Sequence, residues 1–216
     1  MAQMRDGPLP DGLRYVPAFI SPEEEQALLA RIAQVPFREV KMRGQVARRR
    51  TAHYGWDYGY ESWEISPTTP VPAWLLPLRE RAAALINADP RALGEVLISE
   101  YPPGAGIGWH RDAPMFGPAV IGVSLRAPCR MRLQRGRGEE RRTAAIMLEP
   151  RSAYVLSGEA RSAWQHSIPD TKELRYSITF RTLRDEPAVF DLEKGGKAGT
   201  PESPTARIRT FSVSRR

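Results

Sequence analysis

The chain has 216 residues, enough for one domain with a sizeable hydrophobic core and flanking tails. Its formal net charge of +7 favours an anionic partner such as nucleic acid, although basic charge also serves solubility. The single cysteine, Cys129, excludes an intramolecular disulfide framework and fits a reducing compartment. No apolar run approaches the length of a membrane span and the N-terminus lacks an apolar signal region, so we expect a soluble cytoplasmic protein.

The N-terminal part predicts a mobile segment, a short strand and a helix. Residues 1–12 are polar and contain Pro and Gly, whereas residues 13–20 have the composition of a strand. Ser21 can cap a helix, Pro22 suits its first position, and Glu24 stands three residues after the cap, as in a capping box. An apolar stripe at helical spacing follows and ends at Pro36. A second helix is predicted over residues 78–87.

Residues 41–63 combine arginines with closely spaced tyrosines and tryptophans. Arginines can hold phosphates while aromatic rings stack on bases, as a surface for single-stranded nucleic acid requires. Alternating aromatic residues also describe an ordinary half-buried strand or hairpin, so both interpretations stay open. The residues predicted to contact the substrate are Arg43, Arg49, Trp56 and Tyr58.

From Glu95 onward the pattern changes to short apolar runs separated by turn residues. The predicted strands cover residues 96–101, 107–112, 119–125, 129–134, 144–148, 153–156 and 174–183. Many short strands at this spacing favour a sandwich, barrel or jelly roll. Residues 185–216 are rich in Gly, Pro, Ser, Thr and charge, which predicts a flexible basic tail.

The segment from Gly106 to Asp112 carries the first chemical signal. In a strand, residues i and i+2 point to the same face, so His110 and Asp112 would share one face. His166 offers a third ligand, and two histidines with one carboxylate form the facial triad of non-haem Fe(II) oxygenases. A lone His-x-Asp pair is more often a surface pair than a metal site. His53 has no assigned role, and we expect it to be a core or lid residue.

A second block with the pattern of a chemically functional strand begins at Arg175, nine residues after His166. In the predicted strand at residues 174–183, Arg175, Ser177, Thr179 and Arg181 share one face, while apolar and aromatic residues occupy the other. Standing alone, this could be a surface strand.

Because the His110–Asp112 segment, His166 and the Arg175–Arg181 segment follow one another in this order, the chain resembles the AlkB-like family of Fe(II)- and 2-oxoglutarate-dependent dioxygenases. The resemblance rests on Ile98–Tyr101 with the following Pro102–Ala105, on His110-Arg-Asp112, and on His166 with Arg175-Tyr-Ser-Ile-Thr-Phe-Arg181. It covers about residues 13–184. It implies a mainly β (α+β) fold, a double-stranded β-helix or jelly roll, with helices packed on one side and a lid segment.

The resemblance also implies the site residues. The iron ligands would be His110, Asp112 and His166, and the cosubstrate-binding residues would be Tyr101, Arg175, Arg181, Ser99 and Ser177. The two serines stand where the family usually has asparagine. The two arginines would each hold one carboxylate of 2-oxoglutarate. Because six residues along a strand span roughly 20 Å, longer than 2-oxoglutarate, both could reach it only by bending inward.

The implied reaction uses Fe(II), 2-oxoglutarate and O2, and releases succinate and CO2. Its classical outcome is loss of an N-methyl group as formaldehyde. The first substrate hypothesis is alkylated DNA or RNA, preferably single-stranded, since a base must leave its stack to reach the iron. Basic charge supports it, including arginines at 130, 132, 135, 137, 141 and 142. We expect a monomer that does not associate with membranes.

Two alternatives stay open. After the metal-binding aspartate, the DNA-repair members of the family carry a second acidic residue, where this chain has Pro114. This favours the same chemistry on a protein side chain or a small molecule. A non-catalytic nucleic-acid-binding module is the third hypothesis, which the complete set of His110, Asp112, His166 and both arginines argues against.

Overall fold

The computed structural model describes residues 7–42, 45–58 and 65–183. The chain divides into two units, Met1–Glu186 and Pro187–Arg216, and all described residues belong to the first. The predicted tail at residues 185–216 therefore lies outside the described residues. The predicted boundaries at residues 12 and 184 stay predictions. Within residues 7–12, the Gly7 N–H donates to the Thr143 carbonyl and the Gly12 carbonyl accepts from Ser157 N–H.

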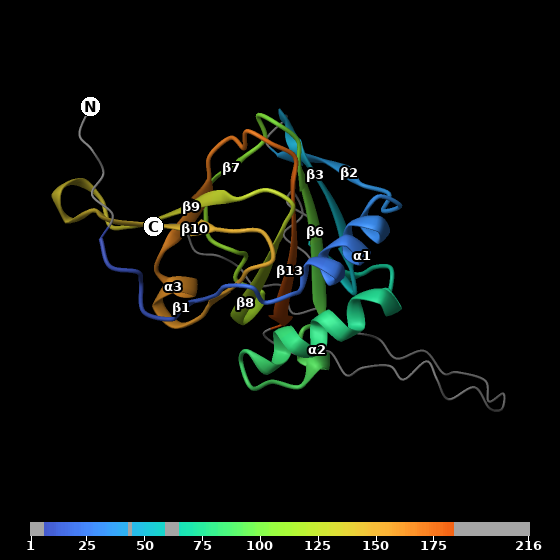
Figure 1. Ribbon diagram of the computed structural model, residues 1–216. Helices are drawn as coiled ribbons and strands as arrows, with labels where there is room; N and C mark the ends of the chain where they lie inside the picture. Colours follow the sequence, from blue (N-terminus) through green and yellow to red (C-terminus); the bar gives the residue numbers. More distant parts are fainter. Residues whose placement is uncertain (1–6, 43–44, 59–64, 184–216) are drawn as a thin grey trace, which may run out of the picture. The chain divides into compact units, whose positions relative to one another are not determined.

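Two antiparallel sheets form the described part (Figure 1). The large sheet has the order β1 (Leu13–Val16), β11 (Ala153–Leu156), β8 (Phe116–Leu125), β13 (Arg175–Leu183), β6 (Glu95–Tyr101), β3 (Gln45–Tyr54) and β2 (Arg38–Met42). The small sheet has the order β10 (Arg142–Leu148), β9 (Cys129–Arg135), β12 (Gln165–Ile168) and β7 (Ile107–His110). A further pair joins β4 (Trp56–Tyr58) to β5 (Ile65–Pro67). This is the predicted jelly roll.

Two helices, α1 (Pro22–Ile32) and α2 (Leu76–Ala84), cover the face of the large sheet that points away from the small sheet (Figure 1). Their apolar residues form one core with β6, β8 and β13. The predicted packing of helices on one side is therefore confirmed. The other helical segments are α3 (Gly158–Ser162) and the 3₁₀ turns Ala73–Leu75, Pro90–Ala92 and Gly138–Glu140. No helix in the described ranges is long and apolar enough to cross a membrane.

Helix α1 begins with the predicted capping box. The Ser21 hydroxyl accepts from Glu24 N–H at 3.1 Å, and the Glu24 carboxylate accepts from Ser21 N–H at 2.7 Å. The helix ends at Ile32, a turn before the predicted end at Pro36. Helix α2 begins two residues before the predicted range 78–87 and ends at Ala84, three residues before its end.

The alternation along β6 and β13 separates the core from a polar inner face. Even-numbered residues such as Ile98, Ile178 and Phe180 pack toward the helices. Odd-numbered residues face the small sheet. The register pairs Arg175 with Tyr101, Ser177 with Ser99, and Arg181 with Glu95. The polar residues of two distant sequence blocks thus meet on one surface.

Several predicted strand boundaries were wrong. The strand at 107–112 ends at His110, so His110 and Asp112 do not share a strand face. Pro114, which has no N–H for a ladder, follows four residues after His110, and Phe116 N–H closes a turn on the Ala113 carbonyl. Strand β1 likewise stops at Val16, before Pro17. Strand β12 was not predicted. In residues 41–63, the strand interpretation is confirmed over β3.

Gly122 allows the Tyr154 ring to lie close against β8 in the space between the sheets. A Cβ at Gly122 would lie 2.3 Å from the Tyr154 ring. We expect Gly122→Ala to lower the free energy of unfolding by about 1–3 kcal/mol, because the ring must move within a packed interior. Urea titration measures this. Gly108→Ala is the control, since its Cβ would meet no described atom within 4 Å; equal stability of the two variants would contradict the argument.

Candidate active site

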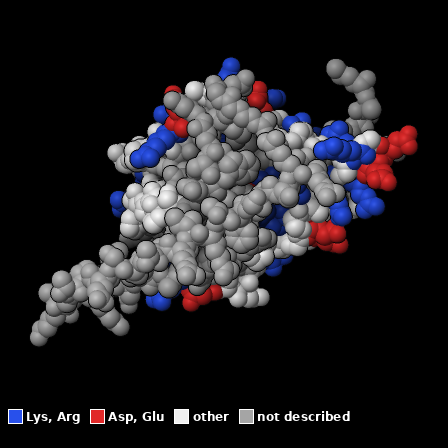
Figure 2. Space-filling model, turned by 180° about the vertical axis from the view of Figure 1, so that it is seen from behind, with Lys and Arg blue, Asp and Glu red and all other residues white. Residues whose placement is uncertain are grey.

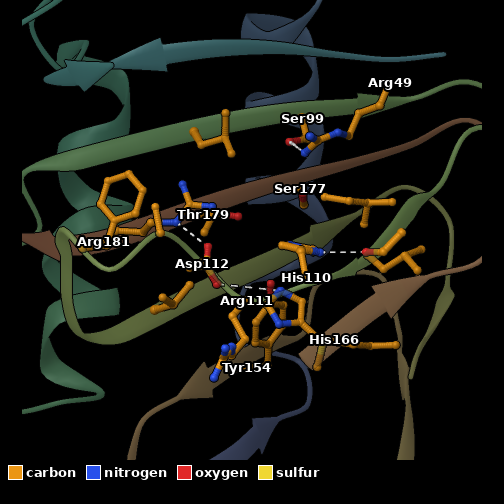
Figure 3. A pocket seen from close by; sticks show the side chains of 18 of the residues that line it. Arg49, Ser99, His110, Arg111, Asp112, Tyr154, His166, Ser177, Thr179 and Arg181 are labelled. Atoms are coloured by element: carbon orange, nitrogen blue, oxygen red, sulfur yellow. Dashed lines mark hydrogen bonds and ion pairs between the residues drawn. The ribbon is translucent and has the colours of Figure 1, made fainter. Parts of the chain in front are cut away.

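A cavity of about 600 Å³ lies between the two sheets (Figure 3). Pockets of this volume commonly hold a small-molecule ligand. Most of the predicted site residues line it: Arg49, Ser99, Tyr101, His110, Asp112, His166, Arg175, Ser177 and Arg181. Trp56 is not among the lining residues. Arg43 and the side chain of Tyr58 lie outside the described residues.

The two predicted histidine ligands lie side by side because β7 and β12 are neighbours in the small sheet. His110 pairs with His166 across the ladder, and their ring centroids are 4.2 Å apart. The Nδ1 atom of His110 is 2.8 Å from the Gly108 carbonyl oxygen. Because a carbonyl only accepts, Nδ1 carries the proton, and the Nε2 lone pair is available to a metal.

Asp112, the third predicted ligand, lies beside the two histidines. Its Oδ2 lies 3.7 Å from His166 Nε2, and its Oδ1 accepts from Arg181 Nε at 2.8 Å (Figure 3). Arg161 of α3 donates to the carbonyl oxygens of Asp112 and Ala113, at 3.2 and 2.9 Å, and thereby fixes the loop that carries the carboxylate. As placed in the described ranges, no three side chains of His, Cys, Asp or Glu form a group that could hold a metal ion. The ligand assignment therefore stays a prediction.

The protonation states of these three groups fit a divalent metal. Burial, with repulsion from His110, lowers the pKa of His166 to about 3, and burial also lowers the pKa of His110. Burial opposes ionisation of Asp112, but Arg181, with smaller effects from both histidines, holds its pKa well below the usual range. At neutral pH the site thus presents two neutral imidazoles and one carboxylate, the forms that bind metals.

Arg181 lies at the end of the cavity that contains Asp112 and the two histidines. Besides Asp112, its Nη1 contacts both carboxylate oxygens of Glu95 at 2.9 and 3.0 Å. His53, which had no predicted role, places Nδ1 3.4 Å from Glu95 Oε1. Glu95 was not predicted from the sequence, although it alternates with Leu97, Ser99 and Tyr101 on one strand face. Arg161, equally unpredicted, gave no signal in the sequence.

Arg175 lies at the other end of the same strand face. It is 1% exposed, donates from Nη2 to the Ser124 hydroxyl at 3.1 Å, and lies 5.0 Å from the Tyr101 ring centroid. Its Nε and Nη1 atoms are buried without a hydrogen-bond partner in the described part of the chain. A buried guanidinium with unpaired donors is a site for a carboxylate, which accepts from both prongs of the fork.

Arg49 enters the same cavity from β3. It is 5% exposed, its Nη1 lies 3.5 Å from the Ser99 hydroxyl, and its guanidinium lies 6.0 Å from the Tyr101 ring centroid. Among the described residues it has no acidic partner. The cavity therefore holds two buried arginines, Arg49 and Arg175, that no carboxylate of the described residues neutralises.

The low pKa of His166 makes the stability of the metal-free protein depend on pH. Between the ordinary pKa near 6.5 and the folded value of about 3, the unfolded chain binds a proton that the folded chain excludes. We expect the free energy of unfolding to fall with pH below about 6.5, by at most about 1.4 kcal/mol per pH unit for this group. Urea titrations at pH 7, 6 and 5 should show a shallower fall in His166→Gln. An equal slope in both proteins would contradict the assignment.

Known proteins resemble this chain over the segment that contains the cavity. Residues 12–181 match the model of the 2OG-Fe(II) oxygenase superfamily. An Arabidopsis thaliana protein named alkylated DNA repair protein ALKBH8 homolog is 29% identical, over 82% of this chain and 59% of its own length. The mouse (Mus musculus) mitochondrial alpha-ketoglutarate-dependent dioxygenase alkB homolog 7 is 30% identical, over 92% of this chain and 86% of its own.

The fold has a counterpart among solved structures. The structure of OsALKBH1 superposes with a TM-score of 0.66 at 14% identity, covering 82% of this chain and 99% of that one. At this identity the likeness shows the fold alone. The family model matches the whole segment that carries both sheets and the cavity. The chain therefore belongs to the 2OG-Fe(II) oxygenase superfamily and to its AlkB-like members, although it spans only 59% of the length of the Arabidopsis relative.

Proposed function

We propose that this dioxygenase removes N-linked alkyl groups from bases of nucleic acid, with a preference for single strands. In this proposal His110, Asp112 and His166 hold Fe(II). The family's Fe(II), with 2-oxoglutarate and O2, supplies the oxidising chemistry that hydroxylates a C–H bond and releases succinate and CO2. The chain's own residues position the cosubstrate, admit the base and exclude bulk water.

The cosubstrate would extend from the metal ligands toward Arg175. The unpaired Nε and Nη1 atoms of Arg175 suit the distal carboxylate of 2-oxoglutarate, and the Tyr101 hydroxyl lies on the same wall. Ser99 and Ser177 lie between this end and Arg181, facing each other across β6 and β13. Because Arg181 already binds Asp112 and Glu95, its place is beside the metal rather than at the distal carboxylate.

Arg175→Met should separate cosubstrate binding from folding. The substitution keeps volume and removes a buried cation that has no anionic partner in the described structure, so we expect the ligand-free protein to unfold at equal or higher free energy. We also expect the affinity for 2-oxoglutarate to fall about 10–100-fold, the value of one or two lost charged hydrogen bonds. Urea titration and calorimetric titration measure the two effects. Unchanged 2-oxoglutarate affinity would remove Arg175 from the cosubstrate site.

The substrate proposal rests on the burial of Arg49 in the cavity wall without an acidic partner among the described residues. Once Arg175 takes the distal carboxylate, the cavity still contains this second arginine without an acidic partner, which calls for a second anion. A nucleic-acid strand brings phosphates, and the nearby aromatic lining of Tyr101, Trp109 and Tyr154 suits a flipped base. The described surface adds less to the argument, because Figure 2 shows basic side chains mixed with acidic ones.

Arg49→Gln tests this assignment. We expect KM for a methylated single-stranded oligonucleotide to rise about tenfold, while KM for 2-oxoglutarate changes little. The dependence of log affinity on log salt should also become shallower by about 0.7, the contribution of one phosphate contact in single strands. Arg48→Gln is the matched control, because Arg48 is the exposed neighbour on the same strand and does not line the cavity. A rise in KM for 2-oxoglutarate alone would instead assign Arg49 to the cosubstrate.

Pro114 favours a second candidate. It lines the cavity at the position where the DNA-repair members of the family carry an acidic residue that contacts the damaged base. An apolar ring there suits a protein side chain or a small molecule that presents a C–H bond without a charged base. The reaction and the cosubstrate residues would be the same.

One experiment distinguishes these candidates. The protein is loaded with Fe(II) and 2-oxoglutarate without oxygen, then mixed with oxygen in the presence of methylated DNA or RNA single strands, or of unmethylated strands of the same sequence. Succinate and formaldehyde formed only with methylated strands would support the proposal. Succinate that no nucleic acid stimulates would favour the second candidate, and the absence of turnover under every condition would contradict both.

A further inference from the structure

We propose that Glu95 is a positioning residue of the metal site: it balances the charge of Arg181, so that the guanidinium does not cancel the attraction of the Asp112 carboxylate for the metal ion. The inference rests on the metal assigned to this site under the proposed function. It adds a residue that lies behind the cavity wall rather than in it, since Glu95 is not among the lining residues.

The geometry places one guanidinium between two buried carboxylates. Arg181 donates from Nε to Asp112 Oδ1 at 2.8 Å, and its Nη1 contacts Glu95 Oε1 and Oε2 at 3.0 and 2.9 Å. The side chains of Asp112 and Glu95 are 4% and 0% exposed, so water screens these charges little. Figure 3 shows the Asp112 end of this contact at the cavity wall.

The charges around the cavity explain why a second carboxylate is needed. Of the described residues that line the cavity, Asp112 is the only acidic one, and it faces four arginines: Arg49, Arg111, Arg175 and Arg181. Paired with Arg181 alone, Asp112 would form a neutral pair and attract a divalent cation weakly. With Glu95 included, the three groups carry a net charge of −1.

Rigid backbone holds Glu95 in this position. It stands directly opposite Arg181 in the ladder between β6 and β13, so the contact follows from the register. His53 of the neighbouring strand β3 lies against the same carboxylate, with Nδ1 3.4 Å from Oε1. The adjacent strands β3, β6 and β13 thus hold the Glu95 carboxylate in place, where it balances the charge of Arg181. Partners of this kind, one contact removed from the metal, strongly affect metal affinity.

Glu95→Gln keeps the size of the side chain and an acceptor for Arg181 but removes the charge. We expect the dissociation constant for Co(II), followed by its visible absorption in the absence of 2-oxoglutarate, to rise tenfold or more. Glu100→Gln is the matched control. Glu100 belongs to the same strand and makes a similar two-oxygen contact with Arg50 at 2.8 and 3.0 Å, but on the opposite face of the sheet. Wild-type Co(II) affinity in folded Glu95→Gln would overturn the proposal.

The double variant Glu95→Gln/Arg181→Met separates charge from geometry. With both charges removed, the group returns to a net charge of −1 when Asp112 binds the metal as a carboxylate, so we expect Co(II) affinity to recover toward that of the wild type. Glu95→Asp, which keeps the charge, should retain most of the affinity. A further loss of affinity in the double variant would overturn the charge argument, and so would Glu95→Asp binding as weakly as Glu95→Gln. Urea titration confirms that each variant is folded.

The same measurement distinguishes failure of this inference from failure of the proposed function. Co(II) binding needs neither nucleic acid nor turnover, and His110→Ala and Asp112→Ala should abolish it. If the wild-type protein binds Co(II) no better than these two variants, the metal assignment itself fails and this inference with it. If wild-type binding is tight and Glu95→Gln binds equally well, only the role of Glu95 fails.

Discussion

The antiparallel pairing of β6 with β13 determines where every charged group of the site lies. A strand alternates its side chains between two faces, so one register decides which residues enter the helix-packed core and which face the small sheet. Here the apolar set that includes Ile98, Ile178 and Phe180 enters the core, and the opposite face carries the ladder pairs Arg175–Tyr101 and Arg181–Glu95. A shift of one residue would exchange the two sets, and the hydrophobic core opposes this.

This register also accounts for the distance between the two arginines. Six residues of strand separate them by roughly 20 Å, which is too far for both to hold a small dicarboxylate end to end. The structure gives them different neighbours: Arg181 binds Asp112 and Glu95, while Arg175 stacks near Tyr101 with two donors unpaired in the described part of the chain. One end of the strand thus carries an arginine that is paired with carboxylates, and the other end carries an arginine with unpaired donors.

The sequence predicted those parts of the molecule that depend on local patterns. The capping box at Ser21 and the alternation along residues 174–183 followed from local patterns. The jelly roll and most of the cavity residues were implied by the family resemblance that the ordered histidine, aspartate and arginine blocks carry. Local patterns could not predict groups that reach the site from distant segments. Glu95, Arg161 and Tyr154 belong to segments with no catalytic motif, and their roles arise from strand pairing and loop packing. His110 and Asp112 were correctly brought together, although the reason was a loop held by Arg161 and Arg181 rather than a shared strand face.

The site concentrates groups that a stable protein ordinarily avoids. Arg175 is a buried cation with unpaired donors among the described residues, and His166 is held in a neutral form by burial. Both conditions cost free energy in the ligand-free chain. The ligands that the family uses would remove this cost, because a carboxylate accepts hydrogen bonds from the guanidinium and a metal binds the imidazole lone pair. The ion pairs of Arg181 with Glu95 and Asp112 do the opposite, since they are satisfied without any ligand. The groups around Arg181 are therefore satisfied in the ligand-free chain, whereas Arg175 and His166 are not. A ligand that satisfies either of these two residues would raise the free energy of unfolding.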